Sequence, residues 1–109
     1  EAEIVAGRHR GPMHGIPFAL KDIYCTAGIR TTGHSRSAET FVPDRDAFSV
    51  TRLYEAGAIL LGKLATHEFA TGGPSFDLPW PPARNPWDLA RITGGSSSGS
   101  GAAVAAGLA

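Results

Sequence analysis

The chain has 109 residues, of which 42% are hydrophobic, and ten basic side chains balance ten acidic ones. This length allows one small hydrophobic core, and the apolar runs are far too short to cross a membrane. A net charge of zero gives no electrostatic basis for binding nucleic acid or a membrane surface. The single cysteine, Cys25, excludes an internal disulfide and fits a reducing compartment, so we expect a cytoplasmic protein.

The first predicted element is a short strand. A turn at residues 11–15 leads into the apolar run 16–20, which ends at Lys21 and Asp22. Because hydrophobic neighbours partly desolvate an amine and disfavour its charged form, Lys21 is a candidate base. The alternative is a Lys-Asp pair that faces water at the end of a strand. Spacing alone favours this second interpretation.

A helix and a second strand follow. Asp46 can cap a helix over residues 47–56, whose apolar positions fall on one face, and Gly57 is suited to end it. The continuous apolar run 58–61 is typical of a strand buried on both faces of an α/β sheet. Several prolines after Phe69 predict an irregular loop, in which we expect both tryptophans to pack. These prolines are Pro74, Pro79, Pro81, Pro82 and Pro86.

The histidines show no pattern typical of a metal site. His67 and Glu68 begin like the helix of a zinc protease, but Thr71 stands where the second histidine must be. The other three histidines lie in polar or turn segments, and we expect them to be solvated loop residues. These three are His9, His14 and His34.

The last predicted element opens with a segment rich in glycine and serine, residues 94–100, and continues as a helix of small residues. A linker is excluded because the following Ala- and Val-rich run only makes sense when buried. A Walker phosphate loop is disfavoured because Ser100 occupies the lysine position. The pattern Gly-x-Ser-x-Gly centred on Ser97 satisfies a nucleophile elbow, but such a match is close to chance here, and residues 85–93 before it show no strand-like run.

Five blocks of the chain, in this order, resemble the amidase signature family of serine hydrolases. The blocks lie at residues 15–22, 57–63, 67–70, 84–87 and 94–100. The resemblance implies an α/β fold, as part of an α/β/α domain with a mixed sheet between helical layers. It also implies that residues 1–109 are a fragment of this single domain, which ends before the segment that carries the family's nucleophilic serine.

The family uses a Ser/cis-Ser/Lys triad. By resemblance, Lys21 is the catalytic lysine and Ser96 the bridging serine, and the Gly95-Ser96 peptide bond should be cis. Neutral Lys21 would take a proton from Ser96, and Ser96 would take one from the downstream nucleophile. The resemblance implies neither a cofactor nor a metal. It places substrate-binding residues at Ala70, Thr71, Gly72, Ser97 and Ser98.

Three functions remain open from the sequence. The first is an amidase, part of a longer chain, that hydrolyses the C–N bond of a small-molecule carboxamide through an acyl-serine. The second is the glutaminase subunit of a tRNA-dependent amidotransferase, which shares fold and triad. It ranks lower because residues 72–80 depart from what we expect of that subunit. The third is a non-catalytic, glycine-rich module that binds an anion at residues 94–100.

Overall fold

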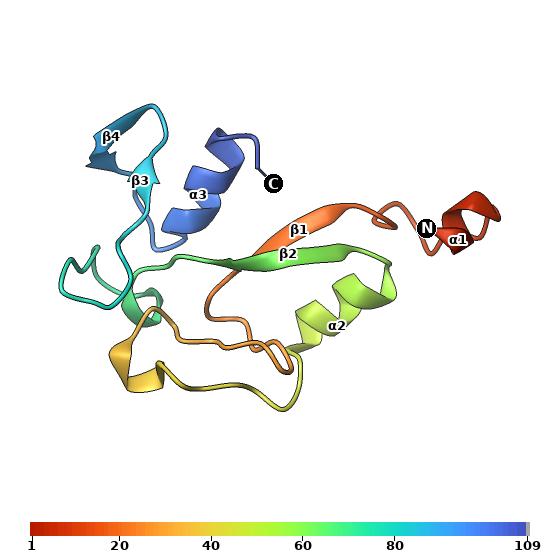
Figure 1. Ribbon diagram of the computed structural model, residues 1–109, viewed down its shortest axis with the longest axis horizontal. Helices are drawn as coiled ribbons and strands as arrows, with labels where there is room; N and C mark the ends of the chain where they lie inside the picture. Colours follow the sequence, from red (N-terminus) through yellow and green to blue (C-terminus); the bar gives the residue numbers. More distant parts are fainter. Residues whose placement is uncertain (109) are drawn as a thin grey trace.

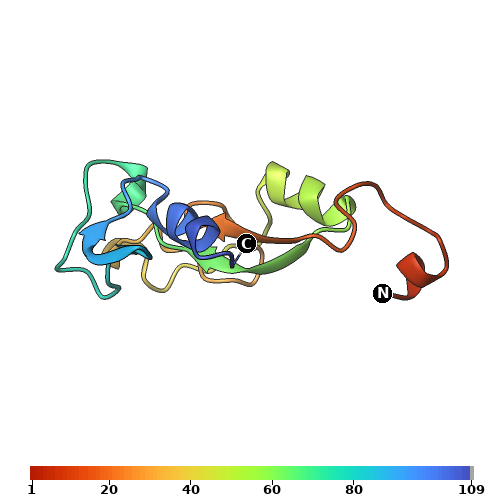
Figure 2. The same cartoon turned by 90° about the horizontal axis from the view of Figure 1, so that it is seen from above.

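The computed structural model describes residues 1–108, and Figures 1 and 2 show it from two sides. These residues form a thin, elongated unit with principal extents of 49, 34 and 17 Å. Its elements in chain order are α1 (Ala2–Val5), β1 (Pro17–Lys21), the 3₁₀ turn η1 (Arg36–Ala38), α2 (Phe48–Glu55), β2 (Ile59–Leu64), the 3₁₀ turn η2 (Glu68–Ala70), β3 (Arg84–Asn85), β4 (Asp88–Ile92) and α3 (Ser98–Ala105).

The central feature is the parallel pair β1 and β2, which α2 connects. Pro17 lies opposite Ile59 and Lys21 opposite Leu64, with one irregularity in the register after Phe18. Parallel strands need such a crossover connection, and both strands run in the same direction toward α3 (Figure 1). Lys21 therefore emerges at the carboxyl edge of the pair, next to the residues that follow β2.

Helix α2 buries the face that its sequence periodicity predicts. Val50 is fully buried, and the ring of Tyr54 packs edge-on against Phe18 of β1 with centroids 6.2 Å apart. Burial raises the pKa of the Tyr54 hydroxyl, and the carboxylate of Asp46 adds a smaller increase. Gly57, with φ of +84°, follows the helix as expected.

The predicted cap of α2 is wrong. The N-cap residue is Ala47, and it makes no side-chain capping bond. The carboxylate of Asp46 instead accepts a hydrogen bond of 2.7 Å from the backbone N–H of Ala27, which lies 19 residues earlier. The carboxylate that the sequence predicts to cap the helix therefore bonds to a backbone N–H far away in the sequence.

Strand β2 is longer than predicted and is not buried on both faces in the described residues. Leu60 pairs with Phe18, which faces α2, so Leu60 lies on the α2 side. Successive side chains alternate, which turns Ile59 and Leu61 to the other side, where they are 53% and 58% exposed. Figure 2 shows α2 on one side of the two strands.

Residues 85–93 contain a strand that the sequence pattern did not predict. β3 and β4 pair antiparallel, and the side chain of Asn85 accepts a hydrogen bond of 2.9 Å from the N–H of Trp87 at the turn between them. The turn at residues 86–87 joins these two short strands. Trp87 is 84% exposed, so the expectation that it packs under the loop is wrong.

Of the three histidines predicted to be solvated, His34 is buried and His14 is half-buried. His34 is 7% exposed and packs edge-on against Trp80, with ring centroids 5.6 Å apart. The ring of His14 lies against Gly57, where an added Cβ would come within 2.5 Å of it. His9 is exposed, as expected. No helix within residues 1–108 has the length and hydropathy needed to cross a membrane.

Candidate active site

A lysine and a serine that lie 75 residues apart in sequence meet at the edge of the strand pair. The Nζ atom of Lys21, the last residue of β1, donates a hydrogen bond of 2.6 Å to Oγ of Ser96. Ser96 lies in the loop before α3, and the peptide bond between Gly95 and Ser96 is cis. Both features match what the resemblance implied.

Backbone contacts fix the Ser96 loop onto the segment that follows β2. The N–H of His67 donates to the carbonyl of Ser96 at 2.9 Å, and the N–H of Gly99 donates to the carbonyl of Ala65 at 2.8 Å. The second contact requires glycine, because a Cβ at position 99 would lie 2.4 Å from the backbone nitrogen of Ala65. The loop thus lies at the carboxyl ends of the parallel strands, where α/β proteins commonly bind ligands.

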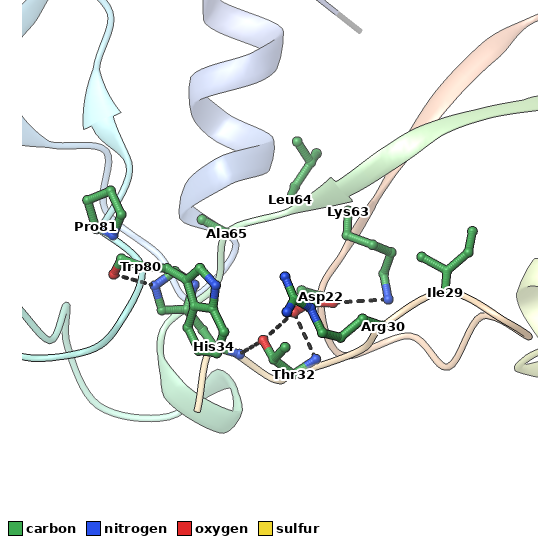
Figure 3. A pocket seen from close by; sticks show the side chains of 10 residues that line it. All are labelled: Asp22, Ile29, Arg30, Thr32, His34, Lys63, Leu64, Ala65, Trp80 and Pro81. Carbon is green, nitrogen blue, oxygen red and sulfur yellow. Dashed lines mark hydrogen bonds and ion pairs between the residues drawn. The ribbon is translucent and has the colours of Figure 1, made fainter. Parts of the chain in front are cut away.

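The neighbouring carboxylate does not pair with Lys21. Asp22 is buried, with Oδ1 at 3.0 Å from Nζ of Lys63, while Oδ2 accepts bonds from the N–H and the hydroxyl of Thr32 (Figure 3). Nζ of Lys63 also donates to the carbonyl of Tyr24 and the hydroxyl of Thr31. The water-facing Lys-Asp pair is therefore not observed. Lys63 bonds to three partners, which include Asp22, whereas Lys21 bonds to Ser96.

We expect Asp22→Ala in the full-length protein to lower the free energy of unfolding by about 3 kcal/mol, because Lys63 would keep its charge in a largely buried place without its partner. Urea denaturation measures the change. The exposed pair of Arg52 and Glu55 is the control, and Glu55→Ala should cost less than about 1 kcal/mol. The folded Asp22→Ala protein should keep most of the activity of the wild-type protein. A folded variant without activity would give Asp22 a role in the chemistry.

The structure links some of the predicted substrate-binding residues to this site. Ser97 is exposed at the start of α3, whereas Ser98 is buried, with Oγ at 3.4 Å from the carbonyl oxygen of Ala65. Ser98 therefore points into the protein. The carbonyl of Gly72 lies 3.1 Å from Nδ1 of His67, whose backbone contacts Ser96. Ala70 is the last residue of η2, and Thr71 lies between it and Gly72.

A cavity of about 410 Å³ has neither Lys21 nor Ser96 in its lining, which Figure 3 shows. Asp22, Thr32, Lys63, His34 and Trp80 line it, together with five other residues, and none of the predicted site residues does. The candidate site therefore rests on the Lys21–Ser96 pair and not on this cavity. In the part of the chain that the structure describes, no three His, Cys, Asp or Glu side chains gather as metal ligands would.

Sequence comparison identifies the family of the chain. A family model described as Amidase matches residues 1–109, the whole chain. The chain belongs to the amidase family. All five sequence blocks that carried the resemblance lie within the matched residues.

Relatives of this amidase-family chain agree in sequence and in fold. A glutamyl-tRNA(Gln) amidotransferase subunit of Moorella thermoacetica is 52% identical over 107 residues, or 98% of this chain and 22% of that protein. Peptide amidase of Stenotrophomonas maltophilia is 41% identical with a TM-score of 0.84, over 99% of this chain and 23% of that one. The corresponding amidotransferase subunit of Thermotoga maritima is 45% identical with a TM-score of 0.79, over 87% and 22%.

The expected α/β fold of the amidase family is therefore confirmed. The chain spans about a fifth of the length of the relatives that it matches. The family pattern predicts Lys21 and Ser96 as catalytic residues. For His67 the sequence pattern raised only a metal site, which Thr71 at the second ligand position disfavours. The contacts of His67 with Ser96 and Gly72 depend on how the folded loops meet, so no local pattern could have predicted them.

Proposed function

We propose that this chain supplies the base and the bridging serine of an amidase that hydrolyses the C–N bond of a small-molecule carboxamide. The observation that carries the proposal is the 2.6 Å contact between Nζ of Lys21 and Oγ of Ser96. General-base catalysis requires the base to be within hydrogen-bond reach of the proton that it removes, and this pair meets the requirement. Family membership supports an amide as the substrate.

The proposed reaction is a proton relay. The neutral amine of Lys21 takes the hydroxyl proton of Ser96, and Oγ of Ser96 takes a proton from a nucleophilic serine outside residues 1–109. That serine attacks the carbonyl carbon, and the relayed proton passes to the leaving amine as the C–N bond breaks. Water, activated by the same relay, hydrolyses the acyl-serine, which releases the carboxylic acid and restores the hydroxyl group of the nucleophilic serine. We expect backbone N–H groups near the nucleophile to hold the oxyanion.

A serine-directed fluorophosphonate should label the full-length protein at a serine outside residues 1–109. The hydroxyl of Ser96 is hydrogen-bonded to Lys21, and Ser98 is buried. Neither serine is therefore placed to attack the reagent. Peptide mapping by mass spectrometry locates the adduct, and heat-denatured protein is the control. Stoichiometric labelling of Ser97 would instead support the nucleophile elbow.

A second candidate is the glutaminase subunit of a tRNA-dependent amidotransferase, which the 52% identity with the Moorella thermoacetica protein favours. Ammonia release by the full-length protein distinguishes the candidates. A glutaminase subunit should act on glutamine and hardly on unrelated carboxamides such as benzamide or peptide amides, and a general amidase should show the reverse preference. Release from either substrate excludes a module that only binds anions.

A further inference from the structure

His67 contacts both halves of the proposed site. Its side chain is buried in the segment after β2, and the residue as a whole is only 8% exposed. Its backbone N–H donates to the carbonyl of Ser96 at 2.9 Å, and its ring Nδ1 lies 3.1 Å from the carbonyl oxygen of Gly72. His67 therefore connects the bridging serine to Gly72, one of the proposed substrate-binding residues.

The His67 ring also fits closely against Gly95. A Cβ built on Gly95 would lie 2.3 Å from both Cε1 and Nε2 of the ring, closer than any side chain allows. Only a glycine lets the ring reach the backbone at this point. Because Gly95 directly precedes Ser96, a displaced ring would release the peptide that sets the direction of Oγ.

The hydrogen-bond partners define what the imidazole can do. A carbonyl oxygen only accepts, so the hydrogen of the neutral ring is on Nδ1 and is donated to Gly72. Nε2 is buried without a hydrogen-bond partner among the described residues and lies beside Gly95. Neither ring nitrogen is directed at the hydroxyl of Ser96, which bonds to Lys21. The ring is therefore placed to orient the loop and not to transfer a proton.

We propose that His67 is a positioning residue of the amidase. It clamps the Gly95-Ser96 peptide against the loop at Gly72 and so keeps Oγ of Ser96 within reach of Lys21. The inference rests on the proposed function for its kinetic consequence, because misplacing a catalytic group by about 1 Å can cost about 100-fold in rate. The clamp can also be tested without kinetics, through the distance between Nζ of Lys21 and Oγ of Ser96.

The test compares two substitutions of His67 in the full-length protein. His67→Leu fills similar space without a donor, and we expect kcat to fall about 100-fold while KM for a small amide stays within about twofold. His67→Asn keeps an amide N–H near the position of Nδ1, and it should recover about tenfold of that loss. His34→Leu is the matched control, because it removes another buried histidine that does not contact Ser96. Its kcat should remain at the wild-type value.

Crystal structures of the same variants test the clamp without any assay. In His67→Leu we expect the distance from Nζ of Lys21 to Oγ of Ser96 to exceed hydrogen-bond reach, whereas His67→Asn and His34→Leu should retain the contact. A His67→Leu structure with the contact intact overturns the inference, as does an unchanged kcat or an equal loss in His34→Leu. If the wild-type protein hydrolyses no amide, the proposed function fails, and the crystal structures still decide whether His67 is the clamp.

Discussion

Lys21→Ala in the full-length protein is expected to lower kcat for amide hydrolysis about 1,000-fold, within the range that a general base contributes. The amine of Lys21 is the only base that the structure places within hydrogen-bond reach of Ser96 among residues 1–108, at 2.6 Å. The other lysine, Lys63, is held by Asp22, Tyr24 and Thr31 and cannot replace it. Steady-state kinetics on a carboxamide measure the loss.

Two further variants separate the proton transfer from the charge of Lys21. Lys21→Arg keeps a positive charge but cannot give up its proton, so it should be as inactive as Lys21→Ala. Arg52→Ala removes an exposed cation from α2, far from the site in sequence, and should leave kcat unchanged. Activity that survives in Lys21→Ala would show that this lysine is only a charge at the end of a strand.

Gly99→Ala should destabilise the full-length protein by about 3 kcal/mol, through overpacking and the loss of a backbone hydrogen bond. The added Cβ would lie 2.4 Å from the nitrogen and 2.9 Å from the carbonyl oxygen of Ala65. Because these neighbours are backbone atoms, the start of α3 must move away. The bond from the N–H of Gly99 to the carbonyl of Ala65 would then break. The midpoint of urea unfolding measures the effect, and the displaced Ser96 should also lower kcat.

Gly101→Ala is the matched control in the same helix. A Cβ at position 101 would meet only the carbonyl oxygen of Thr93, at an ordinary 3.9 Å. Alanine has the higher helix propensity, so this substitution should be neutral or should stabilise the protein by up to about 1 kcal/mol. Equal destabilisation by both substitutions would mean that α3 tolerates no side chain there for a reason other than the contact with Ala65.

Features that depend on neighbouring residues could be predicted from the sequence by itself. The period of the apolar residues in α2 determined its buried face at Val50, and Gly57 marked its end, because both depend on backbone preferences within a few residues. The order of the sequence blocks determined the family, and with it the expectation that Lys21 and Ser96 meet.

Only the tertiary structure decided which polar groups pair across long sequence separations. The carboxylate of Asp46 accepts a hydrogen bond from the N–H of Ala27. Asp22 pairs with Lys63 and not with the adjacent Lys21. The sequence suggested for His67 only an incomplete metal-site pattern. In the structure His67 contacts the carbonyl groups of both Gly72 and Ser96. Burial makes an unpaired polar group costly, so each group takes whichever partner the packed chain brings near it. That partner is set by the packing of β1, β2 and α3, which no local pattern encodes.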